Sequence, residues 1–223
     1  MQLPPDVPVM ILANATLFPQ ALLPLYIFEP RYRRMLSDVL HSHRMFCVAM
    51  QRPGSTRETP VPVAGLGLVR VSVRHGDATS HLILQGLARV QLAGATRYKP
   101  YRRHRIELLP TPPCDSPALD ALVARLRELL DERLRLNVPF PFPVAPVPVP
   151  GSGETGVATR EMLKYLGGIK NPEHLADLVS CAVLPDARER QTILETVPVD
   201  TRLRRLIQFL VADLRRHRPG QKF

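Results

Sequence analysis

The chain lacks tryptophan, and only 5% of its 223 residues are aromatic. Its three cysteines, Cys47, Cys114 and Cys181, have no paired spacing, which argues against a disulfide framework and for a reducing compartment. No apolar run approaches the roughly 20 residues that a membrane-spanning helix needs. The first residues, MQLPPDVPVMILANA, also lack the basic and then continuously apolar pattern of a secretory signal. We therefore expect a cytoplasmic protein that does not cross a membrane.

Lysine is also scarce, with four lysines against 26 arginines. A glycine-rich loop that cradles nucleotide phosphates ends in Gly-Lys-Ser or Gly-Lys-Thr. The nearest candidates, Gly168-Ile169-Lys170 and Gly220-Gln221-Lys222, have neither this spacing nor the hydroxyl. No cluster of histidine, cysteine and carboxylate residues has the spacing of metal ligands. We expect no catalytic residue, no cofactor and no metal site.

The net charge of +10 is distributed unevenly along the chain. Residues 1–110 carry 13 Arg and one Lys against six acidic residues, whereas residues 111–223 carry 13 Arg and three Lys against 14. A basic half of this kind is typical of proteins that bind a polyanion or an acidic protein partner. The alternative interpretation is that the arginines are solvated surface residues from a genome with biased codon usage.

The first half has the pattern of short strands with one helix. Residues 61–73 alternate, which predicts a half-buried strand with Val69, Val71 and Val73 on one face. A turn at residues 75–77 leads to a partner strand. The predicted strands are Val7 to Leu12, Ala21 to Phe28, Met45 to Met50, Val61 to Val73 and Ser80 to Leu92. This pattern favours a small closed barrel with an inserted helix.

The second half changes to helical spacing. Segment 139–150 has six prolines in twelve residues, so it cannot be a helix and favours an extended path. Asn171, Asp186 and Asp200 are predicted to cap helices, because short polar side chains accept hydrogen bonds from the first free amides. The predicted helical segments are Pro117 to Leu136, Glu154 to Leu166, Asn171 to Leu184, Asp186 to Glu195, and a last one that begins at Asp200.

The most informative stretch is residues 17–36, LFPQALLPLYIFEPRYRRML. Leu25 to Phe28 are apolar and rich in aromatic or β-branched types, which predicts a short buried strand. Pro30 suits the first position of a helix, and Tyr32, Met35 and Leu36 follow at helical spacing. A strand that runs almost directly into a helix explains the motif without any chemistry.

The same stretch resembles the signature of the LON substrate-binding domain family, in a stand-alone form. The resemblance implies an α+β fold, with a PUA-like β-barrel carrying an inserted helix over residues 1–112 and a helical bundle over 113–223. This chain departs from the family pattern at Gln20, where glycine is common, and at Tyr26, where histidine is common. The residues that carry the resemblance, with mainly structural roles, are Phe18, Pro19, Pro24, Leu25, Phe28, Glu29, Arg31, Tyr32, Gly65, Gly67, Gly86 and Arg89.

The resemblance implies a non-enzymatic recognition module that binds unfolded or extended polypeptide segments or a protein partner. None of the four lysines lies in a segment that resembles the serine–lysine site of Lon proteases, and no ATPase motif is present. RNA is the alternative partner, since PUA-like barrels elsewhere bind RNA. Its candidate contacts are Arg97, Lys99, Tyr101, Arg102, Arg103 and Arg105, where cations alternate with aromatic rings. A third alternative is an adaptor that delivers clients to a separate protease, and the sequence indicates no oligomeric state.

Overall fold

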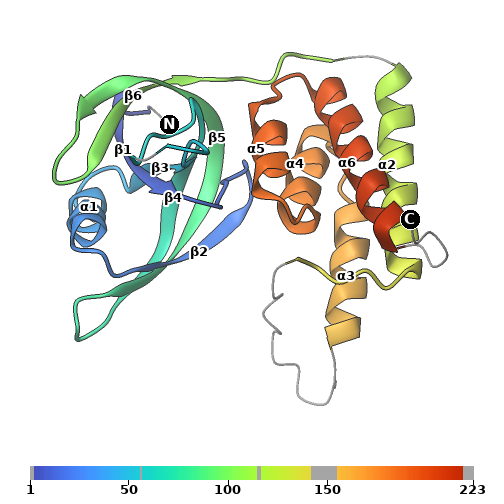
Figure 1. Ribbon diagram of the computed structural model, residues 1–223, viewed down its shortest axis with the longest axis horizontal. Coiled ribbons are helices and arrows are strands. Elements are labelled where there is room, and N and C mark those ends of the chain that lie inside the picture. Colours follow the sequence, from blue (N-terminus) through green and yellow to red (C-terminus); the bar gives the residue numbers. More distant parts are fainter. Residues whose placement is uncertain (1–2, 56, 115–116, 142–154, 218–223) are drawn as a thin grey trace. The chain divides into compact units, whose positions relative to one another are not determined.

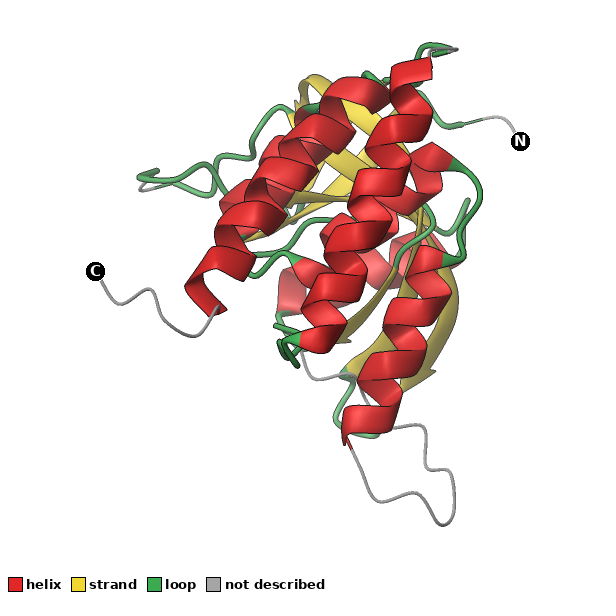
Figure 2. Ribbon diagram, turned by 90° about the vertical axis from the view of Figure 1, so that its right-hand side faces the viewer, coloured by secondary structure: helices red, strands yellow, loops and turns green. Residues whose placement is uncertain are grey.

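The computed structural model describes residues 3–55, 57–114, 117–141 and 155–217. The chain divides into two compact units, Met1–Pro110 (unit 1) and Thr111–Phe223 (unit 2). Within the described residues, all strands belong to unit 1, and all helices except the first belong to unit 2 (Figures 1 and 2). The expected α+β class is therefore confirmed, while the PUA-like relationship stays a prediction.

In its described residues, unit 1 is one six-stranded sheet with a single helix beside it (Figure 1). The strand order is β2-β5-β4-β3-β1-β6, and β6 also pairs with β5. This second pairing closes five strands into a ring and leaves β2 attached to β5. Only β1 and β3 pair in parallel among the described strands. The elements are β1 (Asp6–Leu12), β2 (Leu22–Ile27), α1 (Pro30–Leu40), β3 (Met45–Met50), β4 (Val63–Arg74), β5 (Ser80–Arg97) and β6 (Arg102–Leu108).

The core of unit 1 lies on both faces of the sheet. On one face, helix α1 buries Met35 and Leu36 against Phe46 and Leu84. The Tyr32 hydroxyl group also lies there, within hydrogen-bond distance of the backbone N (3.2 Å) and O (3.3 Å) of Ile11. The other face carries a second apolar cluster, formed mainly by alternate residues of β1 and β3. Together the two clusters fix the sheet and the position of α1.

The segment before β2 is held by close backbone contact with two glycines. Leu17 and Phe18 are buried, and a β-carbon at Gly65 or Gly86 would overlap the carbonyl oxygen of Leu17 or Phe18, respectively. The amide of Gln20 donates to the oxygen of Gly86 at 2.9 Å. Gln20 has a φ of 67°, a left-handed conformation that glycine adopts with less strain. This backbone conformation explains why glycine suits that position in the family pattern.

Two sequence expectations about side-chain direction were wrong. The register shifts between Val69 and Val71, so that Val69 lies opposite the buried Leu84 while Val71 lies opposite Ile83. The extra residue is a β-bulge, which moves Val71 and Val73 to the exposed face. Strand β2, expected to be buried, pairs only with β5 among the described strands and exposes its alternate residues.

Unit 2 consists of five helices within the described residues. Asn171 accepts hydrogen bonds from the amides of Glu173 and His174, and Asp186 accepts one from Arg188, as their predicted capping roles require. Asp200 was wrongly expected to be a cap, because the last helix begins one residue earlier and holds Asp200 in its first turn. Most of the proline-rich segment, residues 142–150, lies outside the described residues. The helices are α2 (Pro117–Arg135), α3 (Thr155–Gly167), α4 (Pro172–Val183), α5 (Ala187–Glu195) and α6 (Val199–His217).

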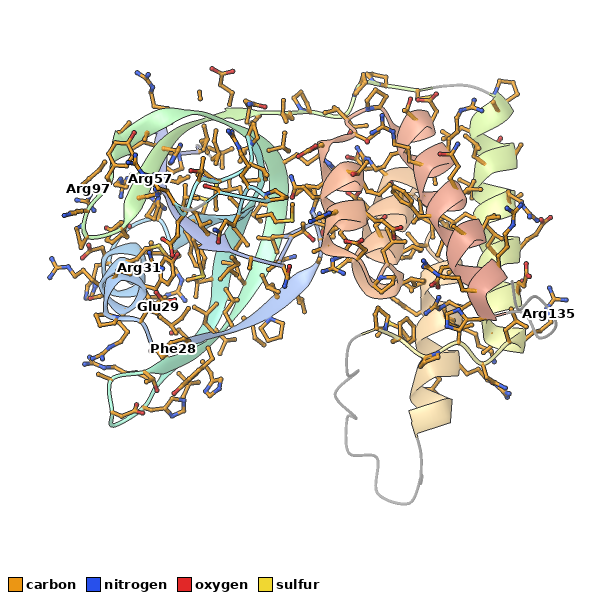
Figure 3. All side chains as sticks on the ribbon, in the orientation of Figure 1. Phe28, Glu29, Arg31, Arg57, Arg97 and Arg135 are labelled. Carbon is orange, nitrogen blue, oxygen red and sulfur yellow. The ribbon has the colours of Figure 1, made fainter. Side chains whose placement is uncertain are left out.

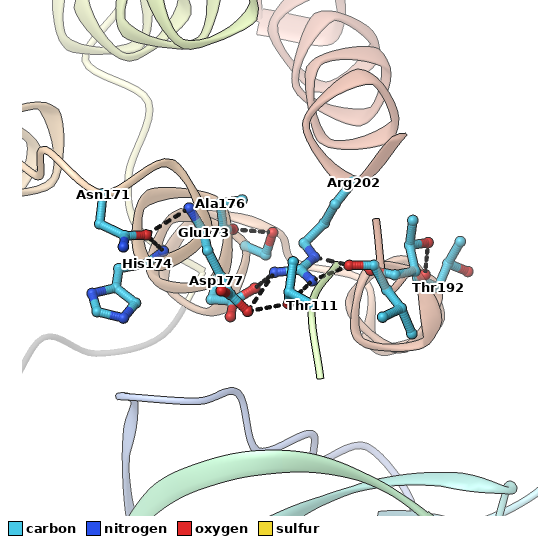
Figure 4. A network of polar contacts seen from close by, with 11 residues as sticks. Thr111, Asn171, Glu173, His174, Ala176, Asp177, Thr192 and Arg202 are labelled. Carbon is cyan, nitrogen blue, oxygen red and sulfur yellow. Dashed lines mark hydrogen bonds and ion pairs between the residues drawn. The ribbon is translucent and has the colours of Figure 1, made fainter. Parts of the chain in front are cut away.

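A buried arginine ties these helices together (Figure 4). Arg202 of α6 is fully buried, and its guanidinium group donates to Asp177 of α4 at 2.9 Å. It also donates to the backbone oxygens of Thr196 and Val197, at 2.9 and 2.6 Å. Because every one of these partners lies inside unit 2, the network specifies how its helices pack.

Candidate functional site

The most unusual surface of unit 1 is a row of exposed apolar side chains, which we call the apolar strip: Pro24, Tyr26, Val71, Val73 and Ile83. Across the sheet, Pro24 lies opposite Ile83, which lies opposite Val71. Val71 and Val73 are 50% and 53% exposed, Tyr26 is 48% exposed and Ile83 is 38% exposed. These five residues, with half-buried Leu25, line a shallow groove of about 400 Å³. The β4–β5 hairpin and the distant strand β2 thus present one continuous apolar surface.

Aromatic rings extend the apolar strip beyond the end of β2. Tyr26 stacks on Phe28 with ring centroids 5.8 Å apart and lies 4.7 Å from His81. His81 in turn shares a hydrogen bond with His75 across the β4–β5 hairpin, at 2.7 Å between ring nitrogens. Phe28 is 59% exposed, so this end also offers flat apolar surface.

The chemistry available at the apolar strip is burial of apolar surface. A contiguous exposed apolar patch on a soluble protein commonly marks an interaction site. Each 100 Å² of apolar surface removed from water contributes about 2.5 kcal/mol of favourable free energy. The groove lining contains no carboxylate, cysteine or hydroxyl group other than that of Tyr26. Its polar side-chain groups are the Tyr26 hydroxyl and the imidazole of His81, which is hydrogen-bonded to His75, so the groove mainly offers contacts to apolar side chains.

The opposite face of the same hairpin has a different character. Between α1 and the hairpin lies a groove of about 470 Å³, which we call the basic groove. Its lining includes Arg33, Arg34 and Arg74, with Ser72 and Ser80 between them. Arg34 is paired with Asp38 on the next turn of α1, at 3.1 Å, and Asp38 does not line the groove. The basic groove therefore carries net positive charge.

The Glu29 and Arg31 pair at the start of α1 forms an internal tether. The Arg31 guanidinium group contacts both Glu58 and Glu29, with 2.7 Å to the nearest Glu29 oxygen (Figure 3 labels Glu29 and Arg31). The hydrogen bonds from Arg31 hold the pKa of the Glu58 carboxyl below its usual value, and the same contacts raise the pKa of Arg31. Glu29 makes no side-chain cap to the helix. These charges join the loop containing Glu58 to α1.

The remaining motif residues take several positions. Pro19 and Arg89 are buried, and Arg89 is only 2% exposed. Gly67 lies where a β-carbon would collide with the side chains of Leu17 and Leu84. Of the motif residues, Pro24 therefore belongs to the strip, Leu25 lines its groove and Phe28 belongs to its aromatic extension.

Part of the basic cluster of residues 97–105 is engaged within unit 1. Arg103 pairs with Asp6 at 2.8 Å, and this hydrogen-bonded pair lowers the pKa of Asp6. Arg97 lies 4.6 Å from the ring centroid of Tyr101, which is itself buried and donates to Asp38 at 2.8 Å.

Three further cations of this cluster point to solvent or lie on an aromatic ring. Arg102 lies 5.2 Å from the exposed Tyr98 ring, and Lys99 and Arg105 are exposed. Arg102 and Lys99 line a pocket of about 320 Å³ together with Arg31 and Glu58. The cluster that the sequence singled out is therefore split between internal ties and exposed charges.

We also searched the described part of the chain for a metal site, a reactive thiol and a membrane-spanning helix. It contains no group of three or more histidine, cysteine or acidic residues placed to hold a metal ion. Cys47 is fully buried, and burial raises the pKa of its thiol well above the usual value, which keeps it protonated and unreactive. Within the same residues, no helix combines the length and the apolar character that crossing a bilayer requires.

Sequence reasoning missed the apolar strip as a site. Alternation correctly indicated β4 and β5, although β6 was not among the predicted strands. It placed Val71 and Val73 on the same face as the buried Val69, because a bulge leaves no reliable mark in the sequence. Glycines within strands indicated that a bulge or bend lies nearby, but they did not give its position. These glycines are Gly65 and Gly67 in β4 and Gly86 in β5.

A family model described as the ATP-dependent protease La (LON) substrate-binding domain matches residues 6–212. The chain belongs to this family. The LON match covers both units and includes every residue of the apolar strip and the basic groove.

Curated relatives and solved structures agree with the LON assignment. The chain is 24% identical over 215 residues to Lon protease of Dictyoglomus thermophilum, covering 95% of this chain and 25% of that protein. It is 29% identical over 220 residues to Lon protease 2 of Sorangium cellulosum, covering 94% of this chain and 25% of that protein. The chain thus spans about a quarter of the length of these relatives.

Two solved structures share the LON fold. The N-terminal domain of Mycobacterium avium complex Lon protease superposes with a TM-score of 0.70 at 17% identity, covering 92% of this chain and 98% of that one. A Lon N-terminal domain protein from Xanthomonas campestris gives a TM-score of 0.62 at 17% identity, with the same coverage. At this identity the likeness establishes the fold.

Proposed function

We propose that this protein is a recognition module that binds exposed apolar segments of unfolded polypeptides at the apolar strip. The observation that carries the proposal is the row of half-exposed Tyr26, Val71, Val73 and Ile83 around a groove of about 400 Å³. An unfolded chain exposes the apolar side chains that such a surface can bury, whereas a folded protein hides most of them. The family description as a substrate-binding domain supports the same assignment.

The proposed module acts without catalysis of its own. The strip offers apolar contacts, the buried Cys47 thiol is protonated, and Arg31 is engaged with both Glu29 and Glu58. Binding of a client and its transfer to a separate protease would need no further chemistry from these residues. The adaptor role is therefore one use of the same binding activity.

The test is fluorescence anisotropy of the full chain with a labelled, permanently unfolded polypeptide. A double variant, Val71→Ser with Ile83→Ser, removes apolar surface from the strip. The matched control is Leu108→Ser, because Leu108 is also an exposed apolar residue of unit 1, at 52%, but lies on β6 outside the strip. All three side chains are exposed, so none of these changes should unfold the protein.

We expect saturable binding that the double variant weakens about ten-fold or more, since central apolar contacts contribute over 1 kcal/mol each. Leu108→Ser should bind as the unaltered protein does. Equal weakening in the control, or no binding at all, would refute the proposal. A parallel titration with single-stranded RNA tests the alternative partner. If the protein binds RNA, the affinity should be high at low salt and should fall steeply as the salt concentration rises.

A further inference from the structure

Strand β4 has an open edge beside the apolar strip. Strand β3 pairs with β4 only from Leu68 back to Gly65, and the last contact on this side joins the amide of Val69 to the oxygen of Arg44 at 2.8 Å. From Arg70 to Arg74, β5 is the single strand neighbour of β4 among the described residues. A strand with one free edge presents unpaired amides and carbonyls that another extended chain can use.

The two faces that flank this edge carry opposite chemistry. Side chains alternate along a strand, so Val71 and Val73 lie on the face of the apolar strip, while Ser72 and Arg74 line the basic groove. A chain added along the edge would place its own side chains alternately over these two faces. One set would contact the valines, and the other would reach Arg74.

We infer that the occupant of this edge is an extended polypeptide segment in which apolar residues alternate with acidic ones. The inference rests on the proposed function and specifies its substrate class. The segment adds to β4 as an antiparallel or parallel strand, with its apolar side chains over the strip and its carboxylates over the basic groove.

Charge in the basic groove favours carboxylates over any other polar side chain. Arg33 and Arg74 both line it, and no acidic residue does. The nearby Asp77 lies in the hairpin turn, where its carboxylate accepts hydrogen bonds from Thr79. A lysine or arginine in the bound segment would face repulsion from the groove.

The experiment uses the full chain and labelled eight-residue peptides, compared by anisotropy. The first peptide alternates leucine or valine with glutamate. The second has the same composition arranged as an apolar block and an acidic block, and the third replaces each glutamate by lysine. Two more versions of the first peptide carry N-methyl groups on one or the other set of alternate amides.

The alternating acidic peptide should bind at least about ten-fold tighter than the lysine peptide, because several charge pairs change sign together. It should also bind tighter than its block isomer. One N-methylated set should abolish binding and the other should leave it intact, because only alternate amides face the partner strand. Arg74→Gln should weaken the acidic peptide about two- to five-fold, and the exposed Arg105→Gln on β6 should not.

Two outcomes would overturn the inference. In one, the block isomer or the lysine peptide binds as tightly as the alternating acidic peptide. In the other, both N-methylated sets bind alike. If the unfolded polypeptide still binds through Val71 and Ile83 in either case, the proposed function stands and only the strand pairing fails. If the unfolded polypeptide does not bind either, both fail.

Discussion

Replacing Arg202 by methionine removes the guanidinium group that joins α4, α6 and the α5–α6 connection in unit 2. The side chain is fully buried and donates to Asp177 and to the backbone oxygens of Thr196 and Val197. Asp177 is equally buried, so the substitution leaves its carboxylate without its arginine partner, away from water. Breaking a buried ion pair from one side typically costs about 3–5 kcal/mol.

The assay is urea unfolding of the full chain followed by circular dichroism, which reports the helices of unit 2. With a slope of about 1–3 kcal/mol per molar urea, the midpoint should fall by roughly 1–5 M. Arg204→Met is the matched control, because it makes the same change two residues along α6 at an exposed position. Adding Asp177→Asn to Arg202→Met should recover part of the loss. A loss below about 1 kcal/mol for Arg202→Met would refute the reasoning.

Three further changes test other parts of the account. Gly86→Ala should destabilise unit 1 by at least about 2 kcal/mol in urea unfolding, because the β-carbon of the alanine would overlap the carbonyl oxygen of Phe18. Gly76→Ala should be nearly neutral, because no atom lies within 4 Å of the position that its β-carbon would take. Burial and the nearby Arg102 lower the pKa of His104 from 6.5, so as the pH falls the unfolded state binds a proton before the folded state does. The free energy of unfolding should therefore decrease as the pH drops below about 6.5. His104→Leu should reduce this dependence of the free energy of unfolding on pH. Cys47 should react with a thiol reagent only as fast as unit 1 unfolds, and alkylation of Cys47 in the folded protein within minutes would contradict its burial.

Much of the fold follows from local sequence patterns. The predicted third strand, residues 45–50, matches β3, and the Pro30 helix matches α1. Asn171 and Asp186 cap their helices because their short side chains reach the first free amides. Asp200 failed as a cap because Val199 already belongs to α6, a shift of the size that separates most predicted and observed helix ends.

The candidate site was harder to predict, because it depends on how the strands pair, both within the β4–β5 hairpin and between β5 and the distant β2. The exposure of Val71 follows from a bulge in its register with β5, and that of Tyr26 from the pairing of β2 with β5 alone. Arg103 likewise pairs with Asp6, and Tyr101 with Asp38, each more than 60 residues away in the sequence. Local periodicity indicates strands, but it does not say which face of each strand remains uncovered.

The most direct test of the central claim is to locate a bound polypeptide on the protein. Amide chemical shifts of the isotope-labelled full chain would be followed by NMR during titration with an unlabelled, permanently unfolded polypeptide. The account predicts that the shifted amides cluster in β2, β4 and β5 around Tyr26, Val71 and Ile83. Shifts centred instead on Tyr98 and Arg102, or on the helices of unit 2, with the strip unperturbed, would contradict it.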